Sequence, residues 1–257
     1  MKKALEYLVG SAVLAATVNA QAHEQAQTAL QVALNDCTEF VGVAPVSEAK
    51  ARALVPARYQ LVSDAAGAKM VVRISDCKSI VVNNRAGQPG TVAHIGIIVD
   101  SPDGTATDPN TSINNYTLTY VSNVPALVSG LRKQGLSAGL AAGLAHEVSP
   151  TTGTSEFYAA VSADTAKTPT WFLHGTVANP QIASEFLANW WYLSKKGEVK
   201  MATSIPLIYF DFSSTVSFYT SRLNVIGELL GSNSIANFPL SFRGQFSSAQ
   251  MTVTRAR

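Results

Sequence analysis

Stretches in which apolar and polar residues alternate run through most of the chain after about residue 69. In residues 115–122, NYTLTYVS, Tyr116, Leu118 and Tyr120 alternate with Thr117, Thr119 and Val121. A period of two is typical of a strand whose two faces differ. Further strand-like segments are residues 69–77, 79–84, 91–100, 156–164, 170–178, 184–194, 197–212, 215–220 and 244–255. Turn residues separate them, and the pattern predicts about nine strands.

Three short helices interrupt this pattern, at residues 47–56, 122–135 and 221–231. Ser47 is placed to cap the first, and Ser122 and Asn123 are placed to cap the second, which Gly135 ends. Because the helices do not alternate with the strands, we expect a mainly β (α+β) fold. The prediction is an antiparallel β-barrel or curved sandwich with about three short helices. The polar run at residues 100–115 is too long for a hairpin turn, so it is a functional loop or a mobile one.

The first residues have the composition of a targeting segment. Two lysines and a mostly apolar run precede Ala20-Gln21-Ala22, which has the small-residue spacing of a cleavage site. We expect a secretory signal peptide at residues 1–22, with an attached amphipathic helix as the alternative. A polar, flexible arm is expected at residues 23–36, followed by a single domain at residues 37–257. No later stretch reaches the roughly 18 apolar residues of a membrane span. The expected location is therefore the periplasm or the outside of the cell, without membrane insertion.

The charge of the chain gives no sign of a nucleic-acid partner. The formal net charge is +2, and loss of residues 1–22 would remove two lysines and one glutamate and leave +1. Such a balance produces no basic footprint for nucleic acid or for an anionic membrane.

Only two cysteines occur, Cys37 and Cys77. In an oxidising compartment they are most simply one disulfide, with a free or reactive thiol as the alternative. The 4 histidines have no metal-ligand spacing. The acidic residues Asp100, Asp103 and Asp108 do not follow the pattern of a calcium-binding loop. We therefore expect no metal and no cofactor.

Residues 135–139, GLSAG, contain a G-x-S-x-G motif that would make Ser137 the nucleophile of a hydrolase. Such a serine acts when a strand leads into it and a helix leaves it. Here the end of a predicted helix precedes the motif, which argues against a nucleophile elbow. A serine hydrolase remains an alternative, and His94 and Glu147 complete the candidate catalytic residues.

Residues 116–140, YTLTYVSNVPALVSGLRKQGLSAGL, resemble the acetoacetate decarboxylase-like family, in which a strand and a short helix lead into G-x-P-K-K-L. Residues 49–61, AKARALVPARYQL, resemble an early motif of the same family, and the likeness covers roughly residues 40–253. It implies an acetoacetate decarboxylase-like barrel. In those enzymes the first lysine forms a Schiff base with a β-keto acid, and the second lowers its pKa.

Both lysines of that motif are replaced in this sequence. The resemblance places Ala138 and Gly139 at their positions, and neither residue can form an imine. Lys133 is expected at a helix end, and Lys195 and Lys196 in a solvated turn. The resemblance therefore implies the fold without the usual Schiff-base chemistry.

The candidate ligand-binding residues are aromatic, together with one histidine and one arginine: Trp190, Trp171, Tyr116, Tyr120, His94 and Arg58. Core packing is the alternative for the aromatic residues. Trp190 and Trp191 are neighbours in a strand, so at most one of them should face a shared cavity. Arg73 is a second cation that could contact an acidic ligand, and Glu156 is a further carboxylate.

These patterns predict a secreted or periplasmic protein that binds a small hydrophobic or carbonyl-bearing, keto-type molecule. The first alternative is a divergent lyase, isomerase or decarboxylase-like enzyme on the same fold. The second is the serine hydrolase. Homo-oligomerisation stays open, and neither nucleic acid nor membrane is an expected partner.

Overall fold

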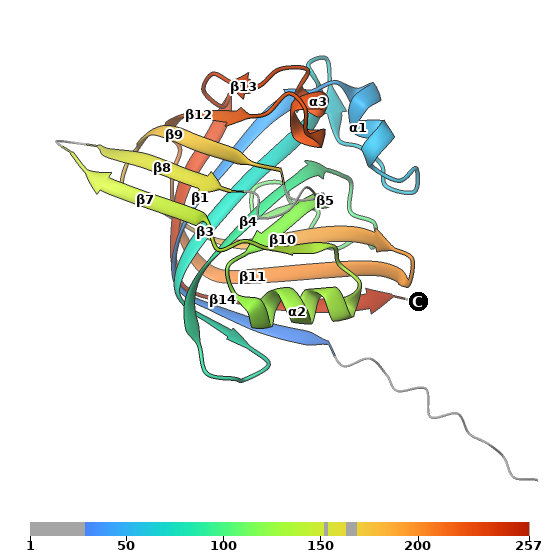
Figure 1. Ribbon diagram of the computed structural model, residues 1–257, viewed down its shortest axis with the longest axis horizontal. Helices are drawn as coiled ribbons and strands as arrows, with labels where there is room; N and C mark the ends of the chain where they lie inside the picture. Colours follow the sequence, from blue (N-terminus) through green and yellow to red (C-terminus); the bar gives the residue numbers. More distant parts are fainter. Residues whose placement is uncertain (1–28, 152–153, 163–168, 257) are drawn as a thin grey trace, which may run out of the picture.

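The computed structural model describes residues 29–151, 154–162 and 169–256, which form a β-barrel with a smaller second sheet beside it (Figure 1). The predicted signal peptide, and residues 23–28 of the predicted arm, lie outside this part of the chain. In the part described, no helix is both long and apolar enough to cross a membrane.

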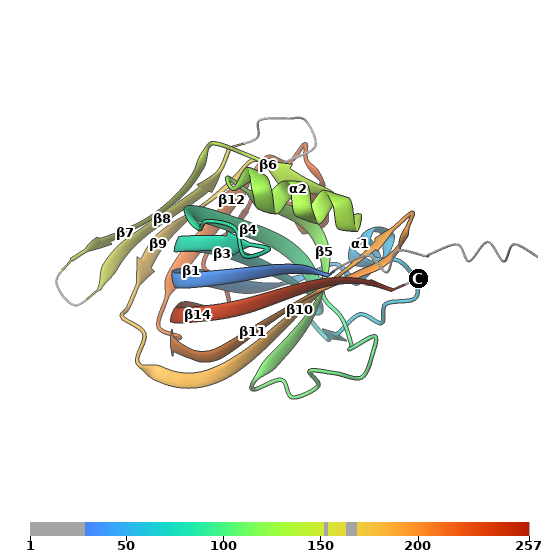
Figure 2. The same cartoon turned by 90° about the horizontal axis from the view of Figure 1, so that it is seen from below.

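Seven strands form the barrel, in the order β1-β14-β11-β10-β5-β4-β3, and the ring closes where β3 pairs with β1. They are β1 (Leu30–Val46), β3 (Gly67–Val82), β4 (Gln88–Ile98), β5 (Ser112–Ser122), β10 (Ile182–Ser194), β11 (Gly197–Asp211) and β14 (Leu240–Ala256). Figure 2 shows β3, β1, β14 and β11 side by side in this order. Two short strands flank the ring, β2 (Ser63–Asp64) beside β3 and β6 (Ala138–Leu140) beside β5.

The predicted barrel is confirmed, although one of its strand pairings is parallel. β5 pairs in parallel with β10, while the other pairs in the ring are antiparallel. A parallel pair needs a long crossover connection. Here the chain between β5 and β10 supplies it, because it contains a helix and three strands of the second sheet.

The second sheet covers part of the outer face of the barrel. Its order is β13-β12-β9-β8-β7, with β7 (Leu144–Pro150), β8 (Ser155–Val161), β9 (Trp171–Val177), β12 (Thr215–Thr220) and β13 (Ser234–Ile235). Phe40 of β1 packs against Phe157 of β8, with ring centroids 5.1 Å apart. Both belong to an outer cluster of buried apolar residues that also contains Trp171 and Trp191.

Three helices are present among the described residues: α1 (Glu48–Leu54), α2 (Pro125–Gln134) and α3 (Val225–Leu230). Ser47 caps α1 as predicted, and Gly135, in the left-handed region with a φ of 103°, ends α2. The predicted caps of α2 are wrong, because its N-cap is Val124. The Asn123 side chain instead accepts a hydrogen bond from the backbone N–H of Thr91, at 2.8 Å, and so ties the segment before α2 to β4.

The predicted flexible arm is wrong for residues 30–36, which are part of β1. Leu30, Val32 and Leu34 are buried in the barrel interior, within an inner cluster of apolar residues. Beyond Asp36, whose φ is 51°, the inner positions become odd-numbered, beginning with Cys37. This change of phase breaks the alternation that identifies a strand in a sequence. The domain therefore begins earlier than Cys37.

α2 fills one end of the barrel interior. Leu127, Val128 and Leu131 belong to the inner cluster, and the backbone of Gly130 lies so close to Leu30 that a Cβ would be 2.8 Å from its side chain. The interior further along the strands is not filled in this way, and it contains the candidate site.

Candidate functional site

A cavity of about 710 Å³ lies inside the barrel, at the end away from α2. All seven strands of the ring contribute residues to its wall. Four phenylalanines, Phe186, Phe210, Phe212 and Phe242, form much of its apolar surface. Their rings contact one another with centroids 5.0 to 6.0 Å apart. The cavity can therefore hold an apolar body of substantial size.

The period of the strands determines which side chains reach this space. On β1, Glu39, Val41 and Val43 line the cavity, whereas Phe40 points to the outer cluster. On β10, Trp190 lines the cavity and Trp191 belongs to the outer cluster. The prediction that the two tryptophans face opposite sides is confirmed.

One ion pair interrupts the apolar wall. Glu39 of β1 and Arg73 of β3 are 3% and 8% exposed, respectively. Arg73 Nε donates to Glu39 Oε2 at 2.8 Å, and Arg73 Nη2 lies 2.7 Å from the same oxygen. The Ser75 hydroxyl also donates to Oε2, at 2.8 Å. A buried charge is tolerated only when it is paired and hydrogen-bonded, and this pair meets that condition.

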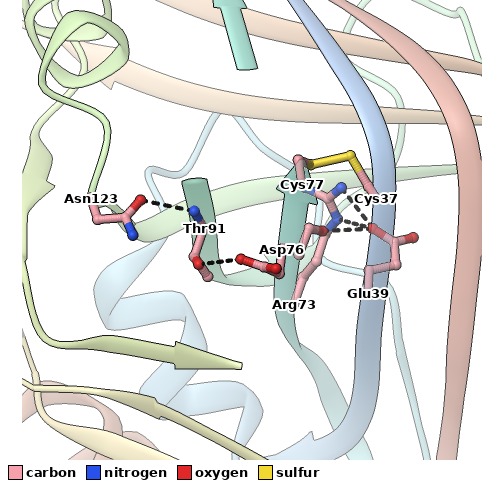
Figure 3. Close-up of a disulfide and its surroundings, with 8 residues drawn as sticks. Cys37, Glu39, Arg73, Asp76, Cys77, Thr91 and Asn123 are labelled. Carbon is pink, nitrogen blue, oxygen red and sulfur yellow. Dashed lines mark hydrogen bonds and ion pairs between the residues drawn. A yellow bond between two sulfur atoms is a disulfide. The ribbon is translucent and has the colours of Figure 1, made fainter. Parts of the chain in front are cut away.

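The disulfide holds this pair in place. Cys37 and Cys77 are directly opposed in the β1–β3 register and are bonded, as predicted. Glu39 and Ser75 are the next opposed pair on the same side of the two strands, and Figure 3 shows Glu39 and Arg73 beside the bridge. The bridge therefore fixes the register on which the Glu39–Arg73 contact depends.

Several buried polar atoms near the ion pair lack a hydrogen-bond partner among the described residues. They are both ring nitrogens of His94, both amide atoms of Asn115, Thr117 Oγ1 and Trp190 Nε1. Asn115 and Trp190 line the cavity and are directly paired across β5 and β10. Most buried polar groups in proteins are paired, so such a concentration is unusual, and a bound molecule could supply partners where a side-chain shift uncovers these atoms.

His94 lies behind this wall. Its ring centroid is 4.3 Å from that of Trp190 and 3.9 Å from that of Tyr120. Burial lowers the pKa of His94 well below its ordinary value, and the nearby charge of Arg73 lowers it further. The imidazole is therefore neutral at physiological pH and can both donate and accept a hydrogen bond.

The structure thus brings together three of the predicted ligand-binding residues, Trp190, His94 and Tyr120, although only Trp190 lines the cavity. Trp171 and Tyr116 lie in the outer cluster. Arg58 is on the surface, 3.5 Å from Glu198.

The candidate catalytic residues other than His94 lie away from the cavity. Ser137 is exposed between α2 and β6, so a helix precedes it and a strand follows, the reverse of a nucleophile elbow. In the described part of the chain, no hydrogen bond joins Ser137 to His94 or His146. Glu147 is exposed on β7.

No lysine among the described residues lines the cavity. Ala138 and Gly139, at the positions of the family's lysines, lie in β6 and pair with β5. Lys195 and Lys196 occupy the β10–β11 turn, as predicted. The described residues also contain no group of three or more His, Cys, Asp or Glu side chains that could hold a metal ion.

The polar loop between β4 and β5 forms one side of the cavity mouth. Gly104, Ala106 and Pro109 are among its lining residues. Lys200 Nζ donates to Asp103 Oδ2 at 2.6 Å and so anchors the loop to β11. Of the two expectations for this loop, the structure supports a role in the site.

Glu39 and the phenylalanine cluster were not predicted from the sequence. The cysteines held a usable signal for Glu39. If Cys37 and Cys77 are opposed on antiparallel strands, residue 39 must oppose residue 75, and Arg73 must be its near neighbour. The phenylalanines come from three strands and the segment after β11, and no local pattern brings them together.

Comparison with known proteins identifies the fold. Neither a scan against protein-family models nor a search of curated protein sequences finds a match. Among solved structures, an acetoacetate decarboxylase is similar with a TM-score of 0.55 and 9% identity, over 88% of each chain. An acetoacetate decarboxylase-like enzyme from Sphingomonas wittichii RW1 has a TM-score of 0.57 and 10% identity, over 89% of this chain and 93% of that one. The enduracididine biosynthesis enzyme MppR, in complex with pyruvate, has a TM-score of 0.56 and 10% identity, over 90% of each chain.

At these identities the likeness establishes the fold alone. The chain has an acetoacetate decarboxylase-like barrel, which confirms the fold implied by the sequence resemblance.

Proposed function

We propose that this protein binds a small, largely apolar molecule with an oxygen-bearing head group inside its barrel. The observation that carries the proposal is the cavity of about 710 Å³, whose apolar wall contains one cluster of buried polar groups. Known ligand sites have this composition: mostly apolar surface with a few polar groups that orient the ligand. The head group would lie against Asn115, Trp190 and Arg73, and the apolar body against the phenylalanines.

The proposal includes a location outside the cytoplasm. The N-terminal sequence pattern supports export, and the Cys37–Cys77 disulfide fits an oxidising compartment. The protein would then act as a periplasmic or extracellular carrier or receptor for its ligand.

Native mass spectrometry of protein purified from its own host tests the binding proposal. A copurified molecule that is released on denaturation is the expected result. Titration with a medium-chain ketone provides a second readout, because Trp190 lies in the cavity wall and its fluorescence should change on binding. The response should be lost in Trp190→Phe and kept in Trp171→Phe, since Trp171 lies outside the cavity. If neither ligand capture nor ketone titration gives a signal, the proposal is wrong.

A second candidate is an enzyme acting on a keto or enol compound. The similar solved structures include an acetoacetate decarboxylase and other enzymes, and Glu39 is a carboxylate in the cavity wall. Its Oε2 accepts the contacts from Arg73 and Ser75, while no hydrogen bond among the described residues involves Oε1. Oε1 could therefore move a proton of a bound ketone.

This candidate predicts that the protein catalyses deuterium exchange at the carbon next to a ketone carbonyl in D₂O, followed by proton NMR. The exchange should disappear in Glu39→Gln and remain in Glu147→Gln, whose carboxylate is on the exposed strand β7. If the ketone exchanges no faster with the protein than in buffer alone, binding remains the proposed function.

A further inference from the structure

We propose that the cavity selects uncharged ligands, with a carbonyl or hydroxyl head, over ionised carboxylates with the same apolar body. This inference rests on the proposed binding function and names its ligand class. The ion pair in the cavity wall determines which charge state of the head group the cavity accepts.

The charged side chains around the cavity leave no cation for an anionic ligand. Among the described lining residues only Glu39, Arg73 and Asp100 carry a charge. Arg73 is already paired with Glu39, and Asp100, which is exposed at the rim, is negative. An ionised carboxylate that enters the cavity would lose its hydration without gaining an unpaired positive partner, which is unfavourable.

Exchange of Glu39 for the ligand's carboxylate is also unfavourable. Both Arg73 and Ser75 point their donors at Glu39 Oε2. Behind Glu39 the space is filled, because a Cβ on Gly244 would lie 3.0 Å from Glu39 Cγ. A ligand that displaced Glu39 would leave a second carboxylate buried and unpaired.

Neutral head groups find suitable partners at the same wall. Asn115 is fully buried, and neither its amide nitrogen nor its amide oxygen has a partner in the described part of the chain. Trp190 Nε1 is a further unpartnered donor beside it, on the paired strand. These atoms are covered by neighbouring side chains, so a ketone or ester oxygen could accept from them, and a hydroxyl could donate to Asn115, after a side-chain shift and without transfer of net charge into the barrel.

The size and rim of the cavity favour a ligand with a long or ring-bearing apolar body. The four phenylalanines line the cavity together with Leu240. Phe212 and Leu240 line the cavity and are each 51% exposed, so the apolar surface continues to the rim. A molecule with a chain of several carbon atoms buries more of this surface than a small keto acid and gains correspondingly more from burial.

Isothermal titration calorimetry at pH 8 with 2-undecanone and decanoate tests the inference. The two molecules share the same nonyl chain and differ in the head group. The ketone is expected to bind at least tenfold more tightly than the carboxylate. Equal or tighter binding of decanoate would overturn the inference and leave the binding function standing. Binding of neither molecule would count against the binding function itself, and the inference would fall with it.

The variant Glu39→Gln should reverse the selection. Without the Glu39 charge, Arg73 becomes an unpaired cation in the wall, so affinity for decanoate should rise at least tenfold. Glu147→Gln is the matched control, because Glu147 is exposed on β7, and its two affinities should equal those of the unmodified protein. No gain of decanoate binding in a folded Glu39→Gln variant contradicts the inference.

If Glu39→Gln does not fold, as judged by circular dichroism, the double variant Glu39→Gln/Arg73→Gln replaces it. This variant has no charge in the inner wall and should still favour the ketone. A preference for decanoate in the double variant would overturn the inference, because its inner wall offers an ionised carboxylate no positive partner.

Discussion

Loss of the Cys37–Cys77 disulfide should lower the free energy of unfolding by about 4 kcal/mol. The bridge closes a loop with a sequence separation of 40 residues. In the chain-entropy account, a loop of this length restricts the unfolded chain by about 4 kcal/mol at 25 °C. The folded protein should change little on reduction, because β1 and β3 remain hydrogen-bonded on both sides of the bridge.

Urea denaturation of the oxidised and the reduced protein, followed by circular dichroism, measures this difference without a change of sequence. The control is the variant Cys37→Ala/Cys77→Ala, whose midpoint should not respond to the reductant. This variant should be less stable than the reduced protein, because both cysteines are buried and their removal leaves unfilled space. A difference below about 1 kcal/mol between oxidised and reduced protein would refute the loop-entropy argument.

Three further predictions concern single positions. Gly96→Ala should cost on the order of 2 to 3 kcal/mol in urea denaturation, since a Cβ would lie 2.5 Å from a backbone oxygen of β5 and 2.8 Å from Trp190; unchanged stability would contradict the packing. Burial opposes ionisation of Asp103, but hydrogen bonds from Lys200 and Thr105 outweigh it and lower its pKa to about 2. The Asp103–Lys200 pair should therefore stabilise the fold above pH 4 and lose its effect as the pH falls through about 2. The difference in melting temperature between Lys200→Met and the unmodified protein should therefore shrink as the pH is lowered from 4 to 2. A difference at pH 2 as large as that at pH 4 would contradict this prediction. A serine-directed fluorophosphonate should not label Ser137, and stoichiometric labelling would restore the hydrolase alternative.

Borohydride treatment in the presence of acetylacetone should leave no adduct, because no lysine among the described residues lines the cavity. A stoichiometric reduced adduct, found by intact mass, would bring back decarboxylase-type catalysis.

Much of the fold could be predicted because its signals are local. Alternation identified the strands after β3 except β6, β7 and β13, and helical composition with closing glycines identified α2 and α3. β1 was missed because its inward-facing positions are even-numbered before Asp36 and odd-numbered after it. The alternation is therefore interrupted in the middle of the strand. β7 was missed because it is a partly exposed edge strand, with no buried face to create a pattern.

The site was harder to predict, because it depends on strand pairing. Trp190 and His94 could be selected from their apolar surroundings in the sequence, and they lie together. Trp171 has similar surroundings but lies in the second sheet, a distinction that only topology makes. Glu39 is one acidic residue among many in the sequence, and its importance arises from Arg73 on another strand.

The closing pair of the barrel has a consequence for the order of folding. Leu30 of β1 pairs with Val253 of β14, so the ring cannot close until almost the whole described chain is available. Pairings over such distances slow folding and leave strand edges exposed in the meantime. The β1–β3 pair needs only residues 30–82, and it contains both cysteines. The disulfide can therefore form early and keep β1 in register with β3 before β14 pairs with the other edge of β1.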